Sequence, residues 1–126
     1  MIYVVSGSRD FPDLGMVKDY IKDHVKPGDT LIHGGARGVD RKAAAVASEW
    51  GAYIVTVPAD WDRHGKSAGV IRNTQMIESA LEHQSRGCEV CGLVFWDGVS
   101  RGTKHFIDTA EKLGLRHYVF KPMEEL

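Results

Sequence analysis

Cysteine, proline and long apolar runs are all scarce in this sequence. The chain of 126 residues contains two cysteines and four prolines. Two cysteines are too few for a disulfide scaffold, and no export signal is apparent, so we expect a reduced, cytoplasmic setting. No apolar run is long enough to span a bilayer, which predicts that the protein has no membrane partner.

An excess of charge of either sign is also lacking. Sixteen lysines and arginines stand against seventeen aspartates and glutamates, and the net charge is −1. A near-neutral chain has no overall basic field, which argues against a nucleic-acid partner. The hydrophobic content of 43% is ordinary for a globular protein. The length predicts one domain over residues 1–126.

The two cysteines are spaced as Cys88-x-x-Cys91. A zinc site would need two further ligands from distant histidines. A thioredoxin-like motif would open a helix, whereas this pair enters an apolar run. We therefore expect neither a metal site nor a bound cofactor.

Short apolar runs alternate with segments of helical periodicity along the chain. The runs predict strands at 2–7, 30–35, 52–57, 93–96 and 116–120. Apolar residues three and four positions apart predict helices over 14–25, 39–50, 70–81 and 106–113, with Trp50 in the core. The final "KPMEEL" is expected to be a frayed terminus. This alternation predicts an α/β fold, a Rossmann-like three-layer α/β/α sandwich with five parallel strands in the order 3-2-1-4-5.

The loops after the first four predicted strands are the most glycine-rich and polar parts of the chain. They read "GSRDFPD", "GGARGVD", "PADWDRHGKSAG" and "DGVSRGTK". Ligands of such sheets bind beyond the carboxyl ends of the strands. Eight of the sixteen basic residues lie in these loops or in the helix turns that they open: Arg9, Arg37, Arg41, Arg63, Lys66, Arg72, Arg101 and Lys104. This layout predicts a site for an anionic ligand.

The second loop has the residues of a phosphate site. Gly34, Gly35 and Gly38 allow the backbone to approach a ligand, and amides at a helix N-terminus bind phosphate. Arg37 can add a bidentate contact, and Asp40 can cap the helix or accept from a ribose hydroxyl. The alternative is a tight turn with an N-capping aspartate, because the loop matches neither GxGxxG nor a P-loop. "SRGT" after the fourth strand repeats the arrangement.

The third loop offers groups for the rest of a nucleotide. Trp61 can stack on a base, a contact worth about 1–3 kcal/mol, or anchor the long loop. Asp60 can accept from ribose hydroxyls, and Arg63, His64 and Lys66 can close over phosphates.

Four stretches carry a resemblance to a known family. "SGSRDF", "HGGARGVDR", "PADWDRHGKSAGVIRN" and "VFWDGVSRGT" resemble the small stand-alone, YspA/YpsA-like branch of the SLOG superfamily, common in bacteria and phages. "GGARGVD" is also similar to a loop of DNA-processing protein A. The resemblance covers about residues 2–120. It implies a Rossmann-like fold that binds nucleotides or nucleotide-derived ligands at these loops.

The resemblance leaves the activity open. Related LOG enzymes cleave the base from nucleoside monophosphates and carry a PGGxGTxxE stretch. Here Gly102-Thr103 is followed by "KHFID", whose first acid is Asp108, more than a helical turn past the phosphate-binding end. If cleavage occurs, Asp60 and Asp97 are the catalytic candidates, because each follows a strand.

Three functional classes follow from these patterns: a binder or sensor of a nucleotide-derived signal, a hydrolase of an N-glycosidic or phosphate bond, and a binder of single-stranded nucleic acid. We favour the first. Relatives often pair, and apolar residues Met76, Ile77 and Leu81 predict a homodimer or larger homo-oligomer. The expected ligand-binding residues are Gly7, Ser8, Arg9, Asp10, Gly34, Gly35, Ala36, Arg37, Gly38, Asp40, Arg41, Asp60, Trp61, Arg63, His64, Lys66, Arg72, Asn73, Asp97, Ser100, Arg101, Gly102 and Thr103.

Overall fold

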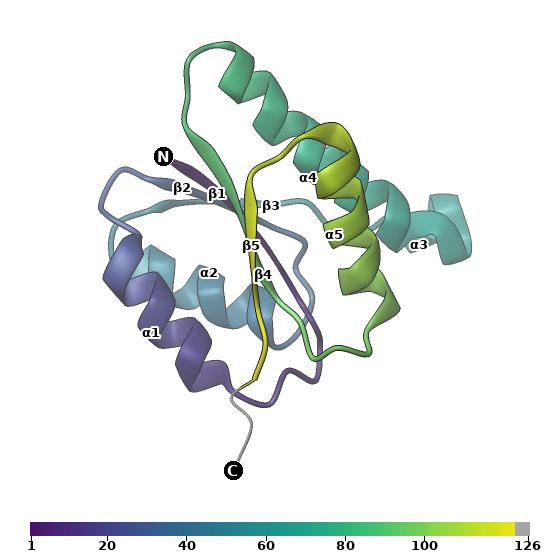
Figure 1. The fold of residues 1–126 in the computed structure, drawn as a ribbon, viewed down its shortest axis with the longest axis horizontal. Coiled ribbons are helices and arrows are strands. Elements are labelled where there is room, and N and C mark those ends of the chain that lie inside the picture. The colour runs from purple at the N-terminus through teal and green to yellow at the C-terminus, as the bar shows by residue number, and fades with distance from the viewer. Residues whose placement is uncertain (123–126) are drawn as a thin grey trace.

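The computed structural model describes residues 1–122, which form a five-stranded parallel sheet between two layers of helices (Figure 1). The strands are β1 (Ile2–Gly7), β2 (Thr30–His33), β3 (Tyr53–Thr56), β4 (Val90–Phe95) and β5 (His117–Phe120). The helices are α1 (Leu14–His24), α2 (Val39–Glu49), α3 (Trp61–His64), the 3₁₀ turn η1 (Gly65–Ser67), α4 (Ala68–Ser85) and α5 (Arg101–Leu113). The strand order is β3-β2-β1-β4-β5, which confirms the predicted fold. Of "KPMEEL", residues 123–126 lie outside the described part of the chain.

Helices cover both faces of the three central strands, β2, β1 and β4, and successive side chains of each strand point to opposite faces. Tyr3 and Val5 of β1 pack with buried residues of α1 and α2 on one face. Ile2 and Val4 pack with α4 and α5 on the other face. Figure 1 shows the two helix pairs on opposite sides of the sheet. This double cover explains why the strands are almost wholly apolar.

The ends of the helices differ from the predicted ends. The long loop after β3 contains α3 and η1, and α4 extends from Ala68 to Ser85 rather than over 70–81. Helix α5 begins at Arg101, where the Ser100 side chain caps it by accepting from the Thr103 amide. Within residues 1–122, no helix combines the length and the apolar character needed to cross a membrane.

Two expectations about apolar side chains are wrong. Met76 and Ile77 are 1% and 0% exposed and belong to the core between α4 and the sheet, so they cannot form the predicted contact between subunits. Trp50 is 42% exposed, with the Lys22 amine 5.5 Å from its ring centre. Helical periodicity identified the inward face of α4, but not that the chain itself covers this face.

Candidate functional site

The loops that leave β1, β2, β3 and β4 meet at the carboxyl edge of the sheet and border two adjoining pockets. This edge includes the point where the strand order reverses between β1 and β4, which is the usual place for a ligand in such folds. The pockets have volumes of about 460 and 480 Å³, within the range of about 300–1,000 Å³ that is typical of small-molecule sites.

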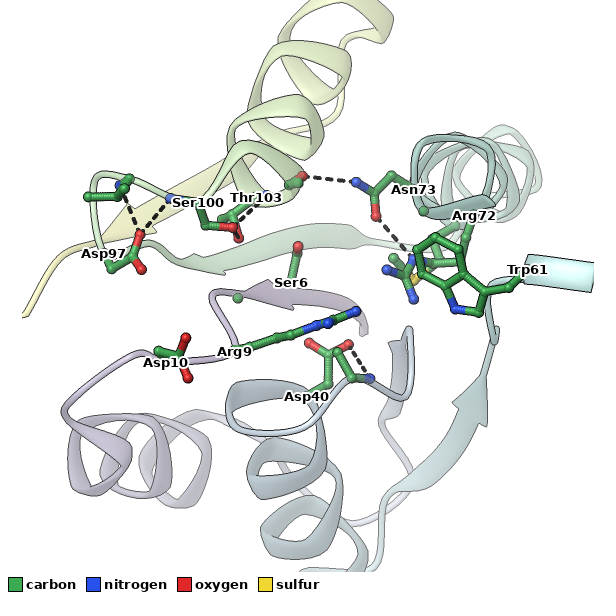
Figure 2. A pocket seen from close by; sticks show the side chains of 16 residues that line it. Ser6, Arg9, Asp10, Asp40, Trp61, Arg72, Asn73, Asp97, Ser100 and Thr103 are labelled. Carbon is green, nitrogen blue, oxygen red and sulfur yellow. Dashed lines mark hydrogen bonds between the residues drawn. The ribbon is translucent and has the colours of Figure 1, made fainter. Parts of the chain in front are cut away.

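The first pocket, called here the polar pocket, lies over the ends of β1 and β4 (Figure 2). It carries three aspartates, two arginines and several neutral hydrogen-bonding side chains. Its lining consists of Ser6, Gly7, Arg9, Asp10, Ala36, Asp40, Trp61, Gly69, Arg72, Asn73, Met76, Asp97, Val99, Ser100, Gly102 and Thr103.

The second pocket, called here the arginine pocket, lies over the ends of β2 and β3. Its lining consists of Arg9, Gly34, Gly35, Ala36, Arg37, Arg41, Thr56, Pro58, Ala59, Trp61 and Arg72. It therefore has four arginines and no carboxylate. Arg9, Ala36, Trp61 and Arg72 border both pockets, so a single ligand can extend across the boundary.

Sixteen of the predicted site residues line one pocket or both, and their part in binding stays a prediction. Seven others line neither pocket: Ser8, Gly38, Asp60, Arg63, His64, Lys66 and Arg101. Sequence reasoning missed Ser6, Thr56, Pro58, Ala59, Gly69, Met76 and Val99. A serine at the end of the apolar run of β1 was the one available signal for Ser6.

Side chains of the protein itself bind the backbone amides of the glycine loop after β2. Asp40, in the first turn of α2, is buried, and its Oδ2 accepts from the amides of Gly34 at 3.0 Å and Ala36 at 3.3 Å. The Gly35 amide donates to Nδ1 of His33 at 3.0 Å. These three amides are thus already bonded, and the predicted use of the loop backbone as a phosphate cradle does not extend to them. Asp40 is also not the N-cap of α2, which is Gly38.

Gly38 allows the ends of β1 and α2 to approach each other. Its φ of +81° lies in a region that side chains disfavour, and a Cβ built there would lie 2.5 Å from the carbonyl oxygen of Arg9. Gly38 also provides no side chain to cap α2. The first turn of α2 therefore lies directly beside the loop that carries Arg9.

Arg72 and Asn73 of α4 hold the surrounding loops together. Arg72 donates from Nη1 to the Gly34 carbonyl at 2.7 Å and from Nε to Oδ1 of Asn73 at 3.1 Å. Asn73 is buried and donates from Nδ2 to the carbonyl of Gly102 at 3.0 Å. Helix α4 thereby ties the β2 loop to the start of α5 (Figure 2). The sequence predicted both side chains near the ligand, but not this bracing role.

Asp97 organises the loop between β4 and α5. Its Oδ1 accepts from the amides of Val99 and Ser100, each at 2.8 Å. The Asp97 amide in turn donates to Oγ of Ser8 at 3.1 Å, and Ser8 Oγ lies 3.5 Å from Oγ1 of Thr103. The amides of Ser100 and Val99 lower the pKa of Asp97, so the carboxylate stays ionised at neutral pH.

Two predicted ligand groups bond to other parts of the protein. Asp60 caps α3 by accepting from the Arg63 amide at 3.1 Å. Arg37 forms an exposed ion pair with Asp10 at 3.4 Å, which contributes little to stability.

Trp61, by contrast, is 53% exposed and borders both pockets. Its ring is therefore accessible to a ligand.

The N-terminal half of the chain, which carries the loops after β1, β2 and β3, matches a known family. A family profile described as "YspA, cpYpsA-related SLOG family" matches residues 1–64, half of the chain, from β1 to the end of α3. The chain belongs to this SLOG family. The chain is also similar to the Gene 61 protein of Mycobacterium phage D29, which is 39% identical over 122 residues, covering 89% of this chain and 90% of that protein.

This SLOG protein departs from the LOG pattern at α5. Asp108, the first acid after Gly102-Thr103, forms an exposed ion pair with Lys104 and lines neither pocket. Ser100, Gly102 and Thr103 do line the polar pocket. The start of α5 therefore contributes hydroxyl and backbone groups to the site rather than a carboxylate.

His33 makes the stability of the glycine loop depend on pH. Since the Gly35 amide must donate to Nδ1, the proton of the neutral ring is on Nε2 and is donated to Thr56 Oγ1 at 2.9 Å. Burial, and then the charge of Arg72, lower the pKa of His33 below its ordinary 6.5. As the pH falls below 6.5, His33 therefore takes up a proton in the unfolded chain more readily than in the folded chain. The free energy of unfolding decreases until the pH has passed the lower pKa of the folded state.

We expect the stability advantage of the wild type over His33→Asn to be smaller at about pH 5.5 than at about pH 8, by urea denaturation. Asparagine can accept the Gly35 amide but does not titrate. The comparison is needed because Asp40, whose pKa is raised from 3.8 to about 6, changes stability in the opposite sense over that window. An advantage that stays constant with pH would contradict the assigned role of His33.

Proposed function

We propose that this protein binds a nucleotide or a nucleotide-derived signal, and acts as a sensor or a sequestering protein. One observation carries the proposal: a pocket with four arginines and no carboxylate adjoins a pocket rich in hydroxyl, amide and carboxylate groups. Membership of the SLOG family, which suggests nucleotide-related binding or LOG-like function, supports the same conclusion.

The distribution of charged residues between the two pockets predicts the orientation of the proposed ligand. Phosphate groups belong in the arginine pocket, because Arg9, Arg37 and Arg41 offer charged hydrogen bonds there. The nucleoside part belongs in the polar pocket, where Asp97 and Ser100 can meet sugar hydroxyls. Trp61 borders both pockets and can stack on a base. This orientation differs from the sequence prediction, in which both Arg37 and Arg101 contact phosphate.

The competing function is hydrolysis of the N-glycosidic bond. Asp97 favours it, because this ionised carboxylate lines the polar pocket and can stabilise positive charge that develops on the ribose. Asp60 and Asp108 do not favour it, because each is engaged outside both pockets. Because the chain lacks the LOG-type glutamate, we place binding ahead of turnover.

The proposal is tested in two steps. Mass spectrometry of small molecules released from the purified, denatured protein identifies a bound nucleotide. Incubation with nucleoside monophosphates, ADP-ribose and NAD, followed by chromatography, then separates a binder from an enzyme. We expect binding without products. Release of base or ribose phosphate by the wild type, abolished in Asp97→Asn, would establish the hydrolase instead.

We also propose that two copies of the chain associate, through a different surface from the predicted one. Tyr53 and Val55 of β3 are 69% and 43% exposed, and β3 is an edge strand that pairs with β2 alone among the described strands. Exposed apolar edges favour association with another chain. Light scattering is expected to show a dimer that Val55→Lys converts to a monomer; a monomeric wild type would contradict this proposal.

A further inference from the structure

Asp40 is the one acidic side chain of the two pockets that is itself buried, at 4% exposure. Its Oδ2 is held by the amides of Gly34 and Ala36. Its Oδ1 has no hydrogen-bond partner, and no side-chain oxygen in residues 1–122 is both buried and unpartnered. Oδ1 is therefore not sealed from solvent. Asp40 lines the polar pocket, and Figure 2 shows its carboxyl group turned toward the pocket interior.

No cation neutralises this carboxyl group through an ion pair within residues 1–122. The charged and titratable groups around it are Arg72 from α4, Arg9 from the end of β1, the neutral His33 from β2, and Arg37 and Arg41 beside it in the arginine pocket. Burial raises the pKa of Asp40 to about 6, against the opposing effects of the Ala36 amide, Arg72 and the Gly34 amide. A ligand anion bound to Arg72 would offset the positive charge by which Arg72 lowers the pKa of Asp40, and so would favour the protonated acid.

Asp40 also lies where the two pockets meet. Ala36, whose amide it binds, borders both pockets, as do Arg9 and Arg72. A phosphate held by these two arginines would therefore lie near Oδ1 of Asp40. An ionised carboxylate at this place repels the phosphate, whereas a protonated one can donate to a phosphate oxygen.

We propose that the ligand binds to the form of the protein in which Asp40 is protonated, and that its Oδ1–H donates to a ligand oxygen at the boundary of the pockets. The ligand class is a phosphate or pyrophosphate ester whose oxygen at this point accepts but does not donate. Binding takes one proton from the solvent onto Asp40, and dissociation returns it. This inference rests on the proposed nucleotide binding and adds the group that selects the ligand oxygen.

The test is calorimetric titration with ADP-ribose, whose pyrophosphate diester does not titrate near neutral pH. We expect wild-type affinity to rise by up to about tenfold for each unit by which the pH falls from about 8 to 6. At about pH 7 the heat measured in buffers of different ionisation enthalpy should show net proton uptake. This measurement needs no variant and so does not depend on the folding of one.

The second part of the test repeats the titration with the Asp40→Asn variant. The amide oxygen can still accept from Gly34 and Ala36, and the amide nitrogen imitates the protonated acid as a donor. We expect its affinity for ADP-ribose to be independent of pH and higher than that of the wild type at about pH 8. Asp97→Asn is the matched control: it removes a carboxylate that stays ionised in the same pocket, so the pH dependence should persist.

Two results would overturn the inference while leaving nucleotide binding intact. One is wild-type affinity that does not vary with pH. The other is weaker binding by Asp40→Asn than by the wild type at every pH, which would make Asp40 an ionised acceptor for a hydroxyl group. Failure of the wild type to bind ADP-ribose and nucleoside monophosphates at any pH would instead remove the proposed function, and this inference with it.

Discussion

Replacing Arg9 with alanine is expected to weaken nucleotide binding by about 10- to 150-fold, since losing a charged hydrogen bond costs about 1.5–3 kcal/mol. Arg9 is placed for a large effect because it borders both pockets. In residues 1–122 its side chain forms neither an ion pair nor a hydrogen bond to another side chain. We therefore expect the free energy of unfolding to stay near that of the wild type, in contrast to Arg72, which also braces the Gly34 carbonyl.

The matched control for this prediction is Arg101→Ala. It removes the same charge from the same edge of the sheet, but Arg101 lines neither pocket. Calorimetry with ADP should show a large loss of affinity in the Arg9 variant and a small one in the Arg101 variant. Equal losses in the two would mean that overall charge attracts the ligand, and an unaffected Arg9 variant would place the phosphate elsewhere.

Replacing Gly38 with alanine is expected to lower the free energy of unfolding by about 2–6 kcal/mol. A φ of +81° with a side chain costs about 1–3 kcal/mol. A Cβ only 2.5 Å from the Arg9 carbonyl oxygen forces the loop after β1 away from α2, at a further cost of about 1–3 kcal/mol. Because that loop carries Arg9 into both pockets, nucleotide binding should weaken as well.

Gly28→Ala separates these two causes. Gly28 has a similar φ of +89°, but a Cβ there would meet nothing within 4 Å. Urea denaturation of both variants should therefore show a smaller loss for Gly28→Ala, with the difference equal to the cost of the close approach. Equal losses would mean that the contact between Gly38 and the Arg9 carbonyl relaxes freely.

The order of elements was predictable from the sequence because apolar periodicity reports which faces of a segment are buried. The alternation of short apolar runs with segments of helical periodicity predicted a parallel sheet, and the glycine-rich loops after the first four strands predicted polar loops at its carboxyl edge. Sixteen residues chosen from those loops and from the helix turns that follow them do line the two pockets. The loops that follow the strands of a parallel sheet all lie at the carboxyl edge of the sheet, so their position follows from the topology alone.

Which groups in those loops remain free for a ligand was decided only by the tertiary structure. Asp40 and His33 accept from the loop amides that the sequence predicted for phosphate, and Arg72 and Asn73 brace neighbouring loops. Arg101 lines neither pocket. The order of residues along the chain sets where a backbone goes, because periodicity is local. The partner of a polar side chain depends on what packing brings within about 3 Å of it from distant segments, and no local pattern encodes that distance.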